Sequence, residues 1–490
     1  MVDDVSDVTE IIAGAQDDHK KENAFLEESK CAPKTTRSRE DDGDAVREDL
    51  SKEDADGWGP EEREEGNDHD EDGGLPLYGH MFSDNVEKIE YYRPDGFHPV
   101  KIGDMFNQYK VVHKLGYGGF ATVWLARDTK EERYVALKIV LGQASQNVAD
   151  IDIKGLSHVR DCVARGMLAP YIDLPLDHFW FDGPNGRHMC VVSHFHGPSI
   201  SSFELFPHKL RLGPGHSQRL ALQLTQSLAF LHCSDVGIAH GDVTTSNILL
   251  ELENMDSWSI EKLYKELGEP TKEPVYSYKG GPLGTSAPEH VYERADLTRL
   301  AKYATGNLKI VDFGESFFLS DAPEGLGTPA RFCSPELMPE KNCGKASDVW
   351  ALACTIFEMR SGLHLFDAFL GSDGEALGSI LDLIGPAPAH LKALGCLEET
   401  EASKKALKLK DYAESISTAE IDPESGKVVG TSKISEAEAE LLFDLLSSAL
   451  KYDVGERATA AQLLGHPWFS FVSTKNDILL DMRNGQPIVW

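Results

Sequence analysis

The chain has 490 residues, and its 81 acidic residues outnumber its 48 lysines and arginines, which gives a formal net charge of −33. Such acidity excludes nucleic-acid binding through a basic surface and electrostatic anchoring to an acidic membrane. Apolar residues make up 41% of the chain, enough for a sizeable core. No apolar run reaches the roughly 20 residues that a membrane-spanning helix needs. The eight cysteines form no CxxC pair, so we expect a reducing compartment and neither a disulfide scaffold nor a zinc ribbon.

The N-terminal segment is far more acidic than the rest of the chain. Residues 1–75 hold 26 acids and 9 bases, a net charge of −17, which is about half of the total. A segment of this composition cannot bury enough apolar surface to offset the entropy of ordering. We therefore predict a disordered acidic tail over residues 1–80. A solvated spacer is the simpler interpretation, and a regulatory or localising role is the alternative.

After the tail, strands come first and helices second. Residues 109–128 predict a strand, a glycine turn and a strand, and residues 134–140 and 189–195 predict two more strands. A helix is predicted over residues 145–156. Apolar residues at three- and four-residue spacing predict longer helices later in the chain, over residues 216–232, 347–362 and 436–450. This order indicates a small sheet lobe followed by a larger helical lobe.

The glycine turn reads LGYGGFATV over residues 115–123. Glycine lets the backbone approach an anion without hindrance from a Cβ atom, although a plain hairpin explains the turn when it is taken alone. Lys138 follows on the third strand, flanked by apolar residues. A lysine in this position suits a phosphate site, and an edge-strand lysine is the alternative.

Two further motifs carry oxygen ligands. HGDVTTSN, at residues 240–247, places Asp242 and Asn247 five positions apart in one loop, and IVDFG places Asp312 directly after a strand. An Asp–Asn pair can hold a substrate hydroxyl and Mg²⁺, and a second Asp can hold Mg²⁺ between phosphates. Each motif is weak alone. Four motifs in this order, each in its expected strand or loop, are hard to explain by chance.

With these motifs the sequence resembles the eukaryotic protein kinase family over about residues 91–472. Ser334-Pro335-Glu336 takes the place of the family's APE motif, and Asp348-Val349-Trp350 opens a buried helix. In the family, a glutamate like Glu336 pairs with an arginine like Arg457 and braces the substrate platform. The resemblance implies a bilobal α+β fold, with an N-lobe over residues 91–194, a C-lobe over 195–472 and a C-terminal extension over 473–490.

Longer segments are similar to the SR-protein kinases. HPVKIGDMFNQYKVVHKLGYGGFATVWLARD looks like the entry to their kinase domain, RHMCVVSHFHG is similar to their hinge, and LGSILDLIGPAPAHLKALG resembles an insert before their last helices. These kinases also carry a spacer between the catalytic loop and the DFG motif. Here the spacer, residues 251–308, is short and contains WSIEKLYKELGEP, so we expect it to be partly ordered. The HGD triplet and the compact spacer look like the fungal branch.

The resemblance assigns catalytic and metal-binding roles residue by residue. Asp242 would orient the substrate hydroxyl and accept its proton, and Lys138 would grip the α- and β-phosphates of ATP. Asn247 and Asp312 would ligate Mg²⁺. His240 is a structural histidine in the family and is not expected to act as a base.

The resemblance also implies an adenine and phosphate site. Ser193 would be the gatekeeper, and the backbones of His194 and His196 would meet the adenine. The ATP-binding residues implied in this way are Leu115, Gly116, Tyr117, Gly118, Gly119, Ala121, Val123, Ala136, Lys138, His194 and His196.

Three positions depart from the family pattern. Gly241 replaces the arginine that normally receives an activation-loop phosphate, which argues against that form of control at Ser316, Ser320 or Thr328. Thr244 replaces the lysine that touches the transferring phosphoryl group, and the loss of one cation there could cost a few kcal/mol. Asp152, with Asp150 as the fallback, stands where the family has a longer glutamate paired with a residue like Lys138; a solvated helix face is the alternative for both.

We therefore expect a serine/threonine protein kinase that uses ATP and Mg²⁺ and acts on protein substrates, in particular basic Arg/Ser-rich ones. A pseudokinase scaffold that binds nucleotide weakly is the alternative. The resemblance points to a monomer in the cytoplasm and nucleus, with no direct binding to nucleic acid or membrane. Acids near the insert would attract an arginine-rich substrate, although a solvated surface is the simpler view of each; they are Asp367, Asp373, Glu375, Asp382, Glu398, Glu399 and Glu401.

Overall fold

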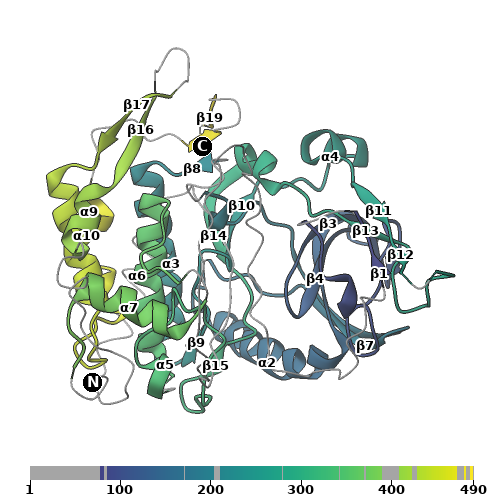
Figure 1. Ribbon diagram of the computed structural model, residues 1–490, viewed down its shortest axis with the longest axis horizontal. Coiled ribbons are helices and arrows are strands. Elements are labelled where there is room, and N and C mark those ends of the chain that lie inside the picture. Colours follow the sequence, from purple (N-terminus) through teal and green to yellow (C-terminus); the bar gives the residue numbers. More distant parts are fainter. Residues whose placement is uncertain are drawn as a thin grey trace, which may run out of the picture.

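The protein has a sheet lobe and a helical lobe that lie side by side (Figure 1). The computed structural model describes residues 78–81, 85–169, 171–203, 210–278, 280–340, 343–368, 371–388, 408–421, 428–471, 479–481 and 486–488. Nearly all of the predicted acidic tail and most of the C-terminal extension therefore lie outside the described residues. So do Glu398, Glu399 and Glu401, and the side chains of Asp150 and Asp152.

The sheet lobe is built on one six-stranded antiparallel sheet in the order β2-β3-β4-β5-β7-β6. One face buries alternate apolar residues, among them Trp124, Leu137 and Val192. The three predicted strands that begin the lobe are found, as is the strand that ends it. The strands are β2 Met105–Phe106, β3 Tyr109–Tyr117, β4 Ala121–Asp128, β5 Arg133–Val140, β6 Asp177–Gly183 and β7 Gly186–His194.

Two elements of this lobe differ from the sequence prediction. Helix α2 runs from Ser145 to Ala164, eight residues beyond the predicted end at Leu156, because Val159 and Cys162 continue its buried face. Strand β6 was not predicted, and none of its residues is fully buried. Without a buried face it lacks the alternation of apolar and polar residues that marks a strand in sequence.

The helical lobe forms around α6, Lys345–Ser361, which is buried along almost its whole length. Helix α3, Pro214–Leu231, and helix α10, Glu436–Ala449, pack against it, so all three long predicted helices are present. No helix among the described residues is long and apolar enough to cross a membrane. Shorter helices complete the lobe: α5 Leu337–Glu340, α7 Asp373–Ile384, α9 Leu409–Ser415 and α11 Ala460–Leu463.

Short strands connect or cover the helical lobe. The catalytic region contains β9 Ile238–Ala239 paired with β15 Phe317–Phe318, and β10 Ile248–Leu252 paired with β14 Ala304–Ile310. A hairpin is formed by β16 Ser417–Ile421 and β17 Val428–Lys433. A small sheet joins β8 Leu210–Arg211, β18 Leu479–Asp481 and β19 Gln486–Ile488.

The spacer is more structured than the sequence suggests, and every residue in it except 279 is described. It packs on the sheet lobe, where α4, β11, β12 and β13 lie beside the N-terminal strands (Figure 1). Leu263 and Leu267 of α4 join a core with Val112 and Leu125 of the sheet. The spacer elements are α4 Ile260–Leu267, β11 Lys272–Pro274, β12 Tyr276–Ser277, which pairs with β1 Tyr78–Gly79, β13 His290–Tyr292 and the 3₁₀ helix η4 Leu297–Tyr303.

Candidate active site

The loop after β9 holds Asp242 and Asn247 in contact. The Asn247 amide Nδ2 donates to the Asp242 carboxylate Oδ2 at 2.6 Å and to the Asp242 carbonyl at 3.1 Å. Two backbone hydrogen bonds inside the loop, from Thr244 N to Asp242 O and from Asn247 N to Thr244 O, fix this turn. Because Nδ2 is engaged by Asp242, the amide oxygen of Asn247 is the atom left to ligate a metal.

Asp312 is brought to the same place by the pairing of β10 with β14. Ile248 lies opposite Ile310 in this pair, and Val311 N donates to the Asn247 carbonyl at 2.9 Å. Asp312 then adopts φ 59, a left-handed conformation that is uncommon outside glycine and that occurs at functional sites. Of the two predicted metal ligands, Asn247 thus comes directly before β10 and Asp312 comes just after its partner strand β14, at the same end of the pair.

Lys138 of β5 completes this group. Its Nζ lies 2.7 Å from Asp312 Oδ1. The surrounding protein by itself raises the pKa of Asp312, but attraction to Lys138 and hydrogen bonds from Lys138 and Gly314 N–H outweigh that effect and hold the pKa below its usual range. Asp312 is therefore ionised at neutral pH, as a metal ligand must be.

The catalytic loop rests on a buried carboxylate of α6. Asp348 accepts hydrogen bonds from His240 N at 2.8 Å, Gly241 N at 2.9 Å and His232 Nε2 at 2.8 Å. Burial by itself raises the pKa of Asp348. The hydrogen bond from His232 and the attraction of His232 and His240 outweigh burial, so the pKa lies below its usual value. The loop backbone is thereby anchored, next to Asp242, to a helix that is buried along almost its whole length.

His240 itself has a structural environment, as the sequence predicts. Its ring lies 4.7 Å from that of Phe313, its Nε2 contacts the Val311 carbonyl at 3.2 Å, and Asp242 N donates to its Nδ1. Burial lowers the pKa of His240 below its usual value, so the ring is neutral at pH 7. A neutral ring with Nε2–H donating and Nδ1 accepting satisfies both contacts.

Gly241 has a conformation that no arginine could share. Its φ is 78, and a Cβ atom there would lie 2.3 Å from the Glu315 carbonyl oxygen. The activation segment is closed around it by direct contacts: Thr328 Oγ1 donates to the Gly241 carbonyl at 2.6 Å, and Glu315 Oε2 accepts from Gly327 N at 2.7 Å. The missing arginine is thus replaced by close backbone packing.

Two of the three candidate phosphorylation sites are buried. Ser316 donates to the Phe313 carbonyl at 2.7 Å, and Thr328 contacts Gly241 as described. Of the three residues considered, Ser320 alone is exposed. In this conformation the Ser316 and Thr328 hydroxyls are therefore closed to a modifying enzyme.

The glycine turn between β3 and β4 is closed by a hydrogen bond from Gly118 N to the Ala121 carbonyl at 2.9 Å. A Cβ atom added at Gly116 or Gly119 would meet no atom within 4 Å, so the space beside the turn is open. Val123 of β4 lies opposite Lys138 of β5 in the sheet register, which places the turn's strand beside the lysine.

The hinge, residues 193–197, continues from β7 toward the helical lobe. Ser193 and His194 lie opposite Ala136 and Val135 of β5, and Gly197 N donates to the Leu250 carbonyl of β10 at 2.7 Å. The predicted adenine contacts therefore lie between the two lobes. Leu115 and Tyr117 end β3, and Ala121 begins β4.

The structure also places two positions that depart from the family pattern, and the predicted pair that braces the substrate platform. Thr244 is fully buried in the catalytic loop. Asp152 lies in α2, but its side chain is outside the described part, so its predicted pairing with Lys138 stays a prediction. Glu336 and Arg457 form the predicted pair, with Nη1–Oε1 at 2.6 Å and Nη2–Oε2 at 2.8 Å, both buried.

These residues fit Mg²⁺ and a nucleotide. Asn247 and Asp312 offer the hard oxygen donors that Mg²⁺ prefers, and Lys138 supplies a cation for phosphates. The open space at Gly116 and Gly119 can admit a phosphate chain against the backbone.

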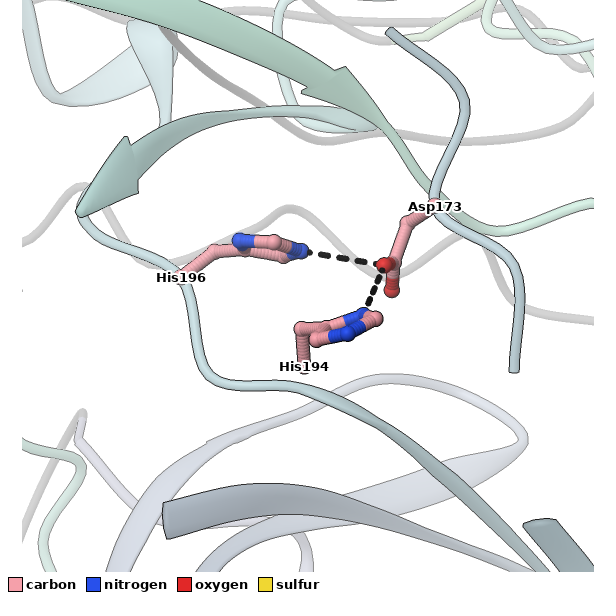
Figure 2. Close-up of side chains that lie close together, drawn as sticks. All are labelled: Asp173, His194 and His196. Atoms are coloured by element: carbon pink, nitrogen blue, oxygen red, sulfur yellow. Dashed lines mark hydrogen bonds and ion pairs between the residues drawn. The ribbon is translucent and has the colours of Figure 1, made fainter. Parts of the chain in front are cut away.

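Two acidic residues with clear structural roles are not predicted by the sequence. Asp348 stands in the sequence only as the start of a buried helix, and no motif surrounds Asp173. Asp173 contacts both His194 and His196 of the hinge (Figure 2). In the sequence, the one signal for the group of Asp173, His194 and His196 is the His-x-His spacing at the end of a predicted strand.

The proteins that are similar to this chain are named as protein kinases. Residues 300–469 match the sequence family described as the protein kinase domain. Protein kinase dsk1 of Schizosaccharomyces pombe is 24% identical over 472 residues, covering 79% of this chain and 85% of that protein. Serine/threonine-protein kinase SRPK of Physarum polycephalum is 26% identical, covering 80% and 93%, and human SRSF protein kinase 3 is 36% identical over 36% of this chain and 31% of its own length.

Proposed function

We propose that the chain is a serine/threonine protein kinase of the SR-protein kinase-like family and that its substrates are proteins with basic, Arg/Ser-rich segments. Protein kinases in general use ATP and Mg²⁺, and the oxygen ligands and lysine of this site suit both. One observation carries the proposal: Lys138, Asp242, Asn247 and Asp312 lie together. Lys138 contacts Asp312, Asn247 contacts Asp242, and the pairing of β10 with β14 brings the two pairs to one place. The relatives give no support to the pseudokinase alternative.

We assign the roles in catalysis as follows. Asp242, positioned by the Asn247 amide, orients the substrate hydroxyl and accepts its proton. Lys138, whose Nζ lies 2.7 Å from Asp312 Oδ1, would supply the cation that grips the phosphates of the nucleotide. Asn247 and Asp312 hold Mg²⁺, which would neutralise charge on the phosphates.

The substrate class is supported by charge. The whole chain carries −33, and acids gather near α7 on the helical lobe. Asp373 and Glu375 occupy the first turn of α7, where acids stabilise the helix itself. Asp367 and Asp382 both lie close enough to Tyr412 to raise its pKa, after the larger effect of burial. These last two are the described acids that we assign to docking of an arginine-rich strand.

The test compares an Arg/Ser-repeat peptide with an acidic peptide, using radiolabelled ATP, wild-type protein and Asp242→Asn. We expect phosphorylation of the Arg/Ser peptide, a poor rate on the acidic peptide, and a loss of roughly 10²–10⁴-fold in kcat for Asp242→Asn. The KM for the Arg/Ser peptide should rise steeply with salt, since the Debye length is about 8 Å at 0.15 M, while the KM for ATP changes little.

A pair of variants locates the docking site. Asp367→Asn combined with Asp382→Asn should raise the KM for the Arg/Ser peptide and leave kcat unchanged. Glu131→Gln, in the exposed turn between β4 and β5, is the matched control and should change neither. Equal turnover of both peptides with no salt effect would reject the substrate class and leave the kinase assignment standing. Failure of the wild type to phosphorylate any peptide would reject the activity itself.

We also propose that the protein acts as a monomer in the cytoplasm and nucleus. An acidic chain of this net charge repels its own copies, which supports the monomer. Light scattering and imaging of a fluorescently tagged full-length chain test the two points. A stable dimer in solution, or exclusion from the nucleus, would contradict them.

A further inference from the structure

Three side chains that could ligate a metal converge behind the hinge, away from the predicted Mg²⁺ ligands. Asp173 Oδ1 lies 3.0 Å from His194 Nδ1 and 3.2 Å from His196 Nε2, and one ligand atom from each residue lies within 4.8 Å of the others (Figure 2). The Asp173 and His196 side chains are 4% and 5% exposed, and that of His194 is 55% exposed. The group is therefore anchored inside the protein and open to solvent on one side.

The fold fixes the three residues from two directions. His194 ends β7 and His196 follows two positions later, a spacing that places side chains on one face of an extended chain. Asp173 lies between α2 and β6, where its N–H donates to the Ile310 carbonyl of β14 at 3.0 Å and its neighbour Ile172 bridges Ile310. The carboxylate is thus held by the strand that precedes Asp312, and the imidazoles by the hinge.

The buried carboxylate requires a positive charge beside it. Burial raises the pKa of Asp173, yet His196 and His194 lower it well below its ordinary value, so the carboxylate is ionised. Among the described residues, Asp173 forms ion pairs with these two histidines and with no lysine or arginine. Its charge must be balanced either by a proton on an imidazole or by a bound cation.

Of these two alternatives, the contacts of His196 favour a bound cation. Its Nε2 faces Asp173 Oδ1, but the contact lacks hydrogen-bond geometry, and neither ring nitrogen has a hydrogen-bond partner in the described part of the chain. A buried imidazole in this state is costly unless a group fills the position between it and the carboxylate. A metal ion bound to the Nε2 lone pair meets that requirement.

We propose that Asp173, His194 and His196 bind one Zn²⁺ ion at the hinge, with the fourth coordination position open to water. Two imidazoles and a carboxylate suit zinc, whereas Mg²⁺ and Ca²⁺ prefer oxygen ligands alone. Tetrahedral zinc with bonds of about 2.0–2.1 Å places its ligand atoms about 3.3 Å apart. The two distances from Asp173 are close to this spacing, and the half-exposed His194 ring already lies beside the His196 ring, with centroids 6.1 Å apart.

The proposed ion would tie together segments that belong to both lobes. His194 extends the sheet, while Asp173 is bridged to β14, which leads to Asp312. The backbones of His194 and His196 are the ones predicted to meet the adenine. Zinc would therefore act as a brace on the hinge, separate from the Mg²⁺ ligands Asn247 and Asp312.

The test measures Zn²⁺ binding to the full-length protein by competition with a chromophoric chelator in excess Mg²⁺, and repeats it with Co²⁺ as a spectroscopic probe. We expect His196→Ala and Asp173→Asn each to lose one equivalent of bound metal relative to wild type, or to weaken it more than about 100-fold. Asp312→Ala is the matched control and should keep that equivalent. Co²⁺ should give the intense visible bands of a four-coordinate site in wild type and in Asp312→Ala.

His194 supplies a variant that cannot fail by misfolding, because its side chain is half exposed. His194→Gln should lose the Co²⁺ bands, and His194→Cys should restore them with an added sulfur charge-transfer band, since a thiolate is a good ligand for both metals. Retention of the same metal equivalent and the same Co²⁺ spectrum in His196→Ala and His194→Gln would overturn the proposal. So would loss of that equivalent in Asp312→Ala.

Discussion

Asp348 in the helical lobe and Asp173 at the hinge are both buried beside histidines, and both have a pKa below the usual range. Their hydrogen-bond partners differ in kind. Asp348 receives two backbone N–H groups from the catalytic loop and one imidazole. Asp173 is met by imidazole side chains alone, one of them half exposed.

The kind of hydrogen-bond partner determines whether each carboxylate site is rigid or adaptable. Backbone N–H groups cannot turn away or carry a proton to solvent, so the Asp348 site has a single geometry and serves to hold the loop that carries Asp242. Side chains can rotate, change protonation and ligate metals. The same residue types therefore produce a rigid anchor in one lobe and an adaptable site between the lobes.

The largest effect is expected from Asp348→Asn. The amide has one acceptor oxygen, so its NH₂ must face a backbone N–H of His240 or Gly241, and a buried charge that satisfied three donors is lost. We expect a loss of about 3–5 kcal/mol of unfolding free energy, and a fall in kcat of more than about 100-fold. Denaturant titration and peptide phosphorylation measure the two.

The matched control is Asp444→Asn. Asp444 Oδ2 also contacts an imidazole, His466 Nε2, at 3.2 Å, but its side chain is 78% exposed. A surface substitution of this kind should change stability by no more than about 0.5 kcal/mol. Equal destabilisation by the two variants would show that the backbone hydrogen bonds to Asp348 do not anchor the loop.

The next effect concerns the loop that Asp348 holds. In Gly241→Ala the new methyl group would press on the Glu315 carbonyl at 2.3 Å and push apart the catalytic loop and the activation segment. Gly237 also has a positive φ, but a Cβ atom there meets nothing within 4 Å. Both alanines incur left-handed strain of about 1–2 kcal/mol, and we expect only Gly241→Ala to lose activity, by at least about 10-fold in kcat.

Steady-state kinetics and thermal melts on the two glycine variants separate strain from steric contact. We expect Gly241→Ala to show the larger melting shift and a selective loss of kcat. If Gly237→Ala loses as much activity, the conformation of the backbone matters and its contact with Glu315 does not.

The comparison also marks how far the sequence could predict the molecule. The catalytic loop comes just before the apolar strand β10, Asp312 comes just after the apolar strand β14, and both carry local motifs, so their residues and their neighbourhood were predictable. Asp173 lies 21 positions before His194 in a stretch with no motif, and its contact with the hinge depends on how the segment after α2 crosses β14. That path is a tertiary feature, and periodic patterns of apolar residues in the sequence do not reveal it.

Gly241 and the spacer illustrate the same limit. The sequence shows that an arginine is missing at position 241, but the positive φ and the closeness of Glu315 appear only when the activation segment is folded. The spacer has one amphipathic helix, α4, while its remaining strands are two or three residues long, too short for a periodic pattern. Its packing on the sheet lobe could therefore not be read from the chain.

His98 and His188 form a second histidine pair, and among the described residues neither ring is hydrogen-bonded to a carboxylate. The rings of His98 and His188 lie 5.2 Å apart, packed with Phe181, and Asp95 is the nearby acid that partly favours charge on His188. Burial, and repulsion from His188, lower the pKa of His98 to about 4. No carboxylate that could hold a proton between these rings is among their described contacts.

The sign of the pH effect follows from that shift. The unfolded chain takes up a proton at His98 near pH 6.5, whereas the folded protein does so only near pH 4, so stability falls as the pH drops through this window. The loss should reach about 2 kcal/mol between pH 6.5 and 5, at roughly 1.4 kcal/mol per pH unit. Urea titrations across this range should show a shallower slope for His98→Phe, and an unchanged slope would contradict the assignment.

The smallest effect is expected from Asp173→Asn in metal-free protein. The substitution keeps an oxygen that can accept from His194 Nδ1, and it removes the cost of burying a charge, so the loss and the gain nearly cancel. The free energy of unfolding, measured with a chelator present, should change by less than about 1 kcal/mol. The same isosteric change at Asp348 should cost several kcal/mol. The two imidazoles can reorient around an amide, and the backbone of the catalytic loop cannot. A loss at Asp173 as large as that at Asp348 would mean that the hinge histidines are held as rigidly as the loop, and the contrast between an anchor and an adaptable site would fail.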